Sequence, residues 1–194
     1  MVLIFDDDIK ARKDALDLVT KWSENRKVEV RLDSVNATSL DSNLNDDVCM
    51  KLLHAKPTGG DKLAIISGGS TNVSNHSKNY FFNKGFIDVL EGLNEFLGSH
   101  PSINPFVALR SSWFNKNTEV TEKTKAFTPA SLKQLLQDLP GVTRRQSNYE
   151  EYMDATIEAV EKAPNEIFTM AKTYSSIDEN EKAFFAFLDK AFLA

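Results

Sequence analysis

The chain has 194 residues, of which 41% are hydrophobic and 26% charged, and its formal net charge at pH 7 is -5. This length suffices for a packed core in one globular domain or in a domain with an appendage. The acidic balance argues against a general nucleic-acid surface, and the single cysteine, Cys49, excludes an intramolecular disulfide framework. No stretch reaches the roughly 20 apolar residues of a membrane span, and the first residues lack the basic start of a signal peptide. We therefore expect a cytoplasmic protein that does not enter a membrane.

Short apolar runs and amphipathic stretches alternate along the first three quarters of the chain. The apolar runs are typical of strands buried on both faces of a parallel sheet, and they lie at residues 2–5, 28–32, 62–67 and 105–109. The amphipathic stretches predict helices at residues 10–25, 45–55, 85–97 and 128–139. Alternation of this kind predicts an α/β fold, a doubly wound parallel sheet with helices on both faces.

The pattern changes after about residue 146, where we expect helices without further strands, at residues 148–163, 164–174 and 178–194. The chain is therefore divided into an α/β domain, residues 1–143, and a C-terminal helical extension, residues 144–194. The last helix carries a broad aromatic face formed by Phe184, Phe185, Leu188 and Phe192. Such a face either packs on the rest of the domain or binds a protein partner or a second copy of the chain.

Three carboxylates, Asp6, Asp7 and Asp8, follow directly after the first apolar run. Ligands of open parallel sheets bind beyond the carboxyl ends of the strands, so these acids lie where chemistry would take place. Clustered carboxylates stay ionised together only when a cation or a basic group compensates them, and oxygen ligands of this kind suit Mg²⁺. Two interpretations remain open on spacing alone. The acids form a metal site, or they are an acidic turn that caps the next helix, where negative charge is favourable.

The stretch VLIFDDDIKAR, residues 2–12, resembles the start of a response-regulator receiver domain, which opens with a strand, an acidic pair and an arginine in the first helix. Asp6, Asp7 and Arg12 stand at these positions. Residues 85–111 resemble the third helix and fourth strand of a receiver, and KAFTPASLKQLL resembles its final segment, with Lys125 at the position of the family's lysine. The resemblance implies a flavodoxin-like sheet, a Mg²⁺ site at Asp6 and Asp7, and Lys125 close to that pair.

Two departures from the receiver pattern remove its phosphorylation chemistry. The third strand of an active receiver ends in the aspartate that accepts the phosphoryl group, whereas here it ends in Ser67, and no Asp or Glu stands between Lys62 and Ile87. Arg110 replaces the Ser or Thr that should end the fourth strand. Without an acceptor carboxylate, aspartyl phosphorylation has no nucleophile. The resemblance therefore implies a degenerate receiver, a pseudo-receiver of two-component signalling that binds a protein partner, binds Mg²⁺ weakly or not at all, and is not an enzyme.

Two other functions remain open. Haloacid-dehalogenase phosphatases also begin with a strand that ends in Asp-x-Asp. A resemblance to them implies Mg²⁺ as cofactor, Asp6 as the nucleophile, Asp8 as the general acid and base, and Ser67 at the second motif. Against this, Lys10 departs from their pattern and no late acidic motif completes the metal site. Alternatively, a receiver could have moved its phosphoacceptor to a hydroxyl group, that of Ser67 or Thr71.

The loop at residues 67–79 joins two glycines to several hydroxyl side chains directly after a strand. Such a loop can present backbone N–H groups to an anion, and Ser67 would then belong to the binding site. The sequence matches no phosphate-binding fingerprint, so a polar surface loop is the simpler interpretation. His76 is the one histidine of the loop and has no neighbouring His or Cys to complete a metal site.

Overall fold

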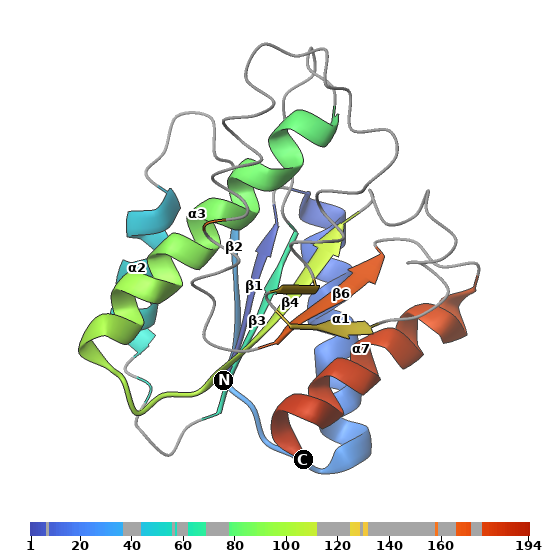
Figure 1. Cartoon of the computed structure of the whole chain (residues 1–194). Helices are drawn as coiled ribbons and strands as arrows, with labels where there is room; N and C mark the ends of the chain where they lie inside the picture. Colours follow the sequence, from blue (N-terminus) through green and yellow to red (C-terminus); the bar gives the residue numbers. More distant parts are fainter. Residues whose placement is uncertain are drawn as a thin grey trace.

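The structure is a computed structural model, and it describes residues 1–6, 8–36, 44–55, 57, 62–68, 78–111, 125–128, 130–131, 158, 166–171 and 176–194. These residues form a six-stranded sheet with helices on both of its faces (Figure 1). In the described part of the chain, no helix has the length and the apolar character that crossing a membrane requires.

Five strands of the sheet are parallel, and a short sixth strand is antiparallel at one edge. The parallel strands are β1 (Val2–Asp6), β2 (Leu32–Asn36), β3 (Leu63–Ser67), β4 (Pro105–Ser111) and β6 (Ile167–Ala171). The antiparallel strand is β5 (Lys125–Phe127), which pairs with β6. The order is β2-β1-β3-β4-β6-β5, so the parallel strands follow the flavodoxin-like order, with β6 as the fifth strand. The predicted α/β fold is confirmed.

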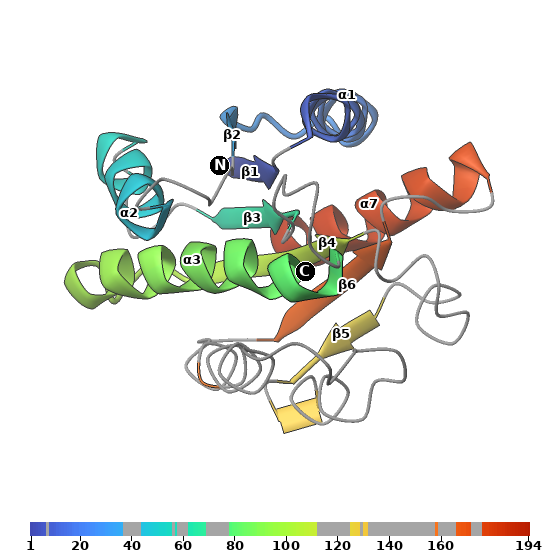
Figure 2. The same cartoon turned by 90° about the horizontal axis from the view of Figure 1, so that it is seen from above.

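Two layers of helices cover the sheet, as Figure 2 shows from above. The helices α1 (Ile9–Arg26) and α7 (Ile177–Phe192) pack against one face and against each other. The helices α2 (Leu44–Ala55) and α3 (Lys78–Ser99) pack together on the other face. Because each helix follows a strand and returns along the sheet, the five parallel strands end at the same edge, and Asp6 at the end of β1 lies at that carboxyl edge.

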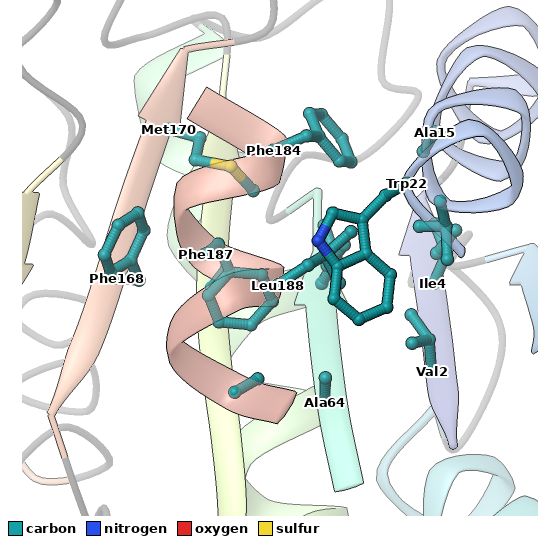
Figure 3. Packing of buried hydrophobic residues seen from close by; sticks show 14 of the residues in the cluster. Val2, Ile4, Ala15, Trp22, Ala64, Phe168, Met170, Phe184, Phe187 and Leu188 are labelled. Carbon is teal, nitrogen blue, oxygen red and sulfur yellow. The ribbon is translucent and has the colours of Figure 1, made fainter. Parts of the chain in front are cut away.

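The core between the sheet and the α1/α7 layer follows from strand alternation. Every second residue of a strand faces the same side, and Val2, Ile4, Ala64, Ile66 and Ala108 are buried there together with residues of α1 and α7. Trp22 of α1 lies between this part of the sheet and α7, near Leu188 (Figure 3). Its ring is fully buried, and its Nε1–H donates a hydrogen bond to Asp189 Oδ1 at 2.8 Å.

The aromatic face of the last helix belongs to this core. Phe184 and Leu188 are buried, and Phe185 and Phe192 are partly buried against the same cluster. Phe192 lies 5.5 Å from Trp22, measured between ring centroids. Packing on the domain, the first of the two interpretations of this face, is therefore confirmed for these side chains, and α7 is the expected C-terminal helix.

The prediction of a helix at residues 164–174 is wrong, because Ile167–Ala171 is the strand β6 between β4 and β5. All five of its residues are buried, whereas an amphipathic helix buries one stripe. A short apolar run such as IFTMA does not distinguish a helix from a strand by its period. The described part of the predicted helical extension thus supplies an interior strand as well as a helix. The predicted boundary at residue 143 lies outside the described residues.

The second strand is displaced from its predicted position at residues 28–32 and lies at Leu32–Asn36. Val28 and Val30 do pack against the core, as partly buried side chains. Pairing with β1 begins only where Leu32 meets Val2, and it continues to Asn36 opposite Asp6. Because β2 is an edge strand with half-buried residues, it lacks the continuous apolar run on which the prediction depended.

Candidate functional site at the carboxyl edge of the sheet

Buried polar residues gather where β1, β3 and β4 end. Asp6 at the end of β1 is 3% exposed, Ser67 at the end of β3 is 1% exposed, and Arg110 near the end of β4 is 3% exposed. The order of the strands reverses between β1 and β3, since β2 lies on one side of β1 and β3 on the other. Open α/β sheets bind ligands at this kind of switch point, so the structure places two of the predicted site residues, Asp6 and Ser67, at the expected edge.

The carboxylate of Asp6 is held by two neighbouring segments. Its Oδ1 accepts a hydrogen bond from the backbone N–H of Asp8 at 2.9 Å. On its other side it lies over Gly68, because a Cβ built on Gly68 would stand only 2.3 Å from Asp6 Oδ2. The backbone N–H of Gly68 also donates a hydrogen bond to the carbonyl of Phe5. A side chain at the position after β3 would therefore have to displace the Asp6 carboxylate.

Two arginines bring positive charge to this edge from different elements. Arg12 of α1 donates a hydrogen bond from Nη1 to the main-chain oxygen of Asp6 at 2.6 Å. Arg110 donates from Nη1 to the carbonyl of Ala11 in α1 at 3.2 Å, and its guanidinium carbon lies 4.9 Å from the ring centroid of Phe184 in α7. Both arginines thus donate to main-chain carbonyl oxygens close to the start of α1.

Asp8 has a structural role at the start of α1. Its Oδ1 accepts the backbone N–H of Lys10 at 2.8 Å and that of Ala11 at 3.3 Å, which is the geometry of a helix N-cap. The helix-capping interpretation of the acidic run is confirmed for this residue. Asp7, the second predicted metal ligand, lies outside the residues that the structure describes.

The structure does not place Ser67 and Lys125 beside the Asp6 carboxylate, where they were expected. Ser67 belongs to the residues of β3 that alternate with Ile66, so its side chain faces the α2/α3 side, away from the face of Ile4 and Asp6. Among the described residues its buried Oγ has no hydrogen-bond partner.

Lys125 lies in the outermost strand, on the row of paired residues that joins Phe5, Ser67, Leu109 and Thr169. Four strand spacings separate it from β1, a distance of roughly 19 Å between Cα atoms. A lysine side chain does not bridge that distance, and the receiver-like placement of Lys125 beside the acidic pair is not found. The reason is that the chain adds β6 between β4 and β5, which moves Lys125 one strand further from the switch point.

Sequence reasoning missed the residues that shape this edge most directly. The buried Arg110 ends the apolar run PFVALR, and a charged residue in that position is a signal for a buried polar group. The role of Gly68 follows only from the register of β1 and β3, which brings Phe5 opposite Ser67.

The described residues contain no group of three or more His, Cys, Asp or Glu side chains that could hold a metal ion. Asp6 is the one predicted metal ligand for which the structure gives contacts: its Oδ1 accepts the Asp8 N–H, and its Oδ2 lies close to Gly68. Comparisons of the chain with family models, with curated proteins and with solved structures found no match. The chemistry of the site is therefore inferred from its own geometry.

Proposed function

We propose that the chain is a receiver-like signalling module that works by protein interaction and is not phosphorylated on an aspartate. The observation that carries this proposal is the end of β3, where a receiver would hold its phosphoacceptor. Ser67 stands there with a buried hydroxyl group, and Gly68 follows it with the Asp6 carboxylate packed against its Cα. A carboxylate nucleophile is missing from both positions, and the space beside them is filled by Asp6.

The state of Asp6 supports a structural role for the acid that a receiver uses to bind Mg²⁺. A Mg²⁺ ion needs carboxylate oxygens that are open to it together with several waters. Asp6 is almost completely buried, and its Oδ1 accepts a backbone N–H that fixes the start of α1. Phosphorylation at this edge would add close to two negative charges beside that carboxylate, which is repulsive and costs desolvation.

A protein partner, or a second copy of the chain, would contact the outward side of the helices. The aromatic face of α7 is used for the core, so its outer face, beginning at the exposed Ile177, is the part of α7 that a partner could reach. On the outer side of α1 and α7, ion pairs join Lys21 to Glu181 and Arg26 to Asp189. A contact here would be polar rather than the apolar surface that the sequence suggested.

The intact mass of the protein after incubation with Mg²⁺ and acetyl phosphate tests the proposal. We expect no gain in mass, while an active receiver domain treated in parallel gains one phosphoryl group. A gain of one phosphoryl group that disappears in Asp6→Ala would contradict the proposal. Because Asp6→Ala also removes a packed side chain, Asp6→Asn serves as the second variant, since it keeps the shape and removes the charge.

A second candidate function is a Mg²⁺-dependent phosphatase of the haloacid-dehalogenase type, with Asp6 as nucleophile and Asp8 as general acid and base. The observation in its favour is that both residues lie at the end of β1 and are joined by the hydrogen bond from the Asp8 N–H to Asp6. The N-cap contacts of the Asp8 carboxylate count against it, because they hold the carboxylate at the start of α1 in a structural role. Hydrolysis of p-nitrophenyl phosphate in the presence of Mg²⁺, lost in Asp6→Asn, would establish this alternative instead.

A further inference from the structure

We propose that the outer edge of β2 is a surface for strand addition by a second copy of the chain, and that the Asp33 carboxylate holds this edge closed. The inference goes beyond the proposed function and does not depend on it, because it concerns the outer side of β2 and not the carboxyl edge of the sheet. It depends on one hydrogen bond, between the Asp33 carboxylate and the backbone N–H of Ser34.

The strand β2 is one of the two outermost strands of the sheet (Figure 2). Within the described part of the chain it pairs with β1 alone. The opposite border is β5, which has only three residues, whereas β2 has five. An outermost strand presents a row of backbone N–H and C=O groups that can pair with another chain, and proteins keep such edges short or cover them. The longer edge, at β2, is therefore the one that needs protection.

The register with β1 shows which backbone groups of β2 point away from the sheet. Val2 lies opposite Leu32 and donates its N–H to the carbonyl of Arg31. Along a strand of a parallel ladder, the backbone groups of successive residues point alternately to one side and to the other. Arg31 and Asp33 therefore turn their backbone groups towards β1, and the N–H and C=O groups of Leu32 and Ser34 point outward.

The Asp33 carboxylate covers one of these outward groups. Its Oδ1 accepts a hydrogen bond from the backbone N–H of Ser34 at 2.8 Å. Its Oδ2 forms an ion pair with Nζ of Lys51 in α2, so the helix beside the strand holds the carboxylate in place. A strand that added to β2 would need the Ser34 N–H for its own carbonyl oxygen, and it would first have to displace Asp33.

The charge of Asp33 adds to this protection. The side-chain hydrogen bond from Lys51 lowers the pKa of the Asp33 carboxyl, partial desolvation opposes this, and the Ser34 N–H adds to the lowering. The carboxyl group is therefore ionised at neutral pH. Two copies that approached each other along this edge would bring two such carboxylates together, and like charges that lie opposite each other on paired strands are destabilising.

The side chains along the edge fit a second copy of the same strand. Val28, Val30 and Leu32 are partly buried against the core, so part of each apolar side chain stays uncovered at the border of the sheet. In an antiparallel pair, the residues whose backbone groups point outward lie opposite one another, and their side chains share one face. A two-fold axis would therefore place Val30 and Leu32 of one copy against the same residues of the other. The apolar face of the sheet would continue from one copy into the next.

The closing contact can be removed without removing the core. The side chain of Asp33 is 51% exposed and that of Lys51 is 34% exposed, and ion pairs between such exposed groups contribute little to stability. Substitution of both residues should therefore leave the fold intact and change only what the edge can bind.

Sedimentation velocity of the wild-type protein and of the double variant Asp33→Val/Lys51→Met tests the proposal. The double variant lacks the acceptor of the Ser34 N–H and both charges, and valine favours a strand. A protein concentration of about 100 µM suits the weak dimer that an interface of one strand from each copy would form. We expect the wild-type protein to sediment as a monomer and the double variant to dimerise with a dissociation constant at least about tenfold lower. A folded double variant that stays monomeric, or a wild-type protein that dimerises equally well, would overturn the proposal.

Ser34→Pro, added to the double variant, is the matched control. Proline has no N–H, and because the Ser34 N–H points away from β1, the ladder to β1 is kept while strand addition is blocked. We expect this triple variant to be monomeric, with the far-UV circular dichroism spectrum of the wild-type protein. A dimer that persists in the triple variant would place the contact on another surface and overturn the proposal.

A second measurement needs only the wild-type protein, and it covers the case in which the double variant does not fold. Hydrogen exchange of the backbone amides of Leu32 and Ser34 is followed by NMR. Both N–H groups point outward, and among the described residues only that of Ser34 has an acceptor, the Asp33 carboxylate. We expect the Ser34 amide to exchange at least about tenfold more slowly than that of Leu32, relative to the rates of an unfolded chain. Equal protection of the two amides would show that Asp33 does not close the edge and would overturn the proposal.

Discussion

The strands β1, β3 and β4 differ sharply between their middle and their carboxyl ends. In the middle, Ile4, Ile66 and Ala108 are packed with α1 and α7 in a purely apolar cluster. Two residues further along each strand, the same face holds Asp6, Gly68 and Arg110, which are a buried anion, a residue without a side chain and a buried cation. One short step along the sheet therefore separates an apolar region from a region that holds buried charges.

The two regions should respond differently to substitution. Apolar packing is non-directional, and a core tolerates exchanges that conserve its volume. Buried charges and close backbone approaches depend on particular partners, so that even a small change of shape or charge is costly.

Trp22→Ala should cause the largest loss, about 3–5 kcal/mol of the free energy of unfolding. The indole ring is fully buried between the sheet and α7, and its Nε1–H bonds Asp189. Urea unfolding monitored by far-UV circular dichroism measures the loss. Ile177→Ala is the control, because Ile177 is 82% exposed, and it should change stability by no more than about 0.5 kcal/mol. A small effect at Trp22 would mean that the α1/α7 layer does not form the main core.

Gly68→Ala should destabilise the protein by about 1–3 kcal/mol, the usual cost of overpacking. The new Cβ would fall 2.3 Å from Asp6 Oδ2, so the carboxylate would have to move. Gly98→Ala is the matched control, since within the described part of the chain nothing lies within 4 Å of a Cβ at Gly98 in α3. That variant should be neutral or more stable by up to about 1 kcal/mol, because alanine favours a helix. Equal effects of the two substitutions would contradict the close approach of Asp6 to Gly68.

Ser67→Ala should raise stability by about 1 kcal/mol, since it removes a buried hydroxyl group that lacks a hydrogen-bond partner among the described residues. The opposite sign is expected for Ser23→Ala. Ser23 Oγ donates a hydrogen bond to the carbonyl of Val28, and its loss should cost about 1 kcal/mol. Thermal unfolding of both variants, compared with the wild-type protein, gives the two signs. A loss of stability in Ser67→Ala would show that the Ser67 hydroxyl group has a hydrogen-bond partner in solution.

The smallest expected effect is a pH dependence at the junction of α1 and α7. The hydrogen bond from Arg26 lowers the pKa of the Asp189 carboxyl, partial desolvation opposes this, and the Trp22 Nε1–H adds to the lowering. A carboxyl whose pKa is lower in the folded state stabilises the fold above its unfolded pKa and loses that contribution as the pH falls through its folded pKa. Stability should therefore decrease below about pH 4, and less steeply in Asp189→Asn.

A second carboxyl group, that of Asp33, should also contribute to the loss of stability at acidic pH, and it provides a check. Lys51 lowers the pKa of Asp33 through their hydrogen bond, with the same sign and in the same range of pH. Urea unfolding at a series of acidic pH values should give a flatter profile for the variant that carries both Asp33→Asn and Asp189→Asn. Identical profiles for that variant and the wild-type protein would contradict these two assignments.

The sequence predicts the fold well where an element is decided by its own residues. The helix α1 begins and ends within one residue of its predicted bounds, because its apolar face repeats at the helical period and Asp8 caps it. The strand β3 is likewise a continuous apolar run between polar ends. The prediction fails for β6, since a run of five apolar residues fits a strand or a buried helix equally well and only the space between β4 and β5 decides between them.

In the candidate site, too, the sequence predicts the features that depend on neighbouring residues and misses those that depend on distant ones. Asp6 at the end of β1 was predicted from its position after an apolar run, and the N-cap role of Asp8 was one of two interpretations of the acids. The contact of Asp6 with Gly68 depends on the register of two strands about 60 residues apart. The displacement of Lys125 depends on β6, which reaches the sheet from the C-terminal part of the chain. Local patterns do not contain such long-range information.

The proposal that Asp6 does not bind a metal ion together with a phosphoryl group is tested most directly by the melting temperature of the wild-type protein. The melting temperature is measured with and without about 10 mM Mg²⁺ and beryllofluoride, which mimics a phosphoryl group. Ligands that bind only the folded state raise its stability by about 2.7 kcal/mol at a hundred times their Kd, which is several degrees for a chain of this size. We expect a melting temperature that does not change, because Asp6 is buried and its Oδ1 already accepts the Asp8 N–H. A rise of several degrees that Asp6→Asn abolishes would contradict it.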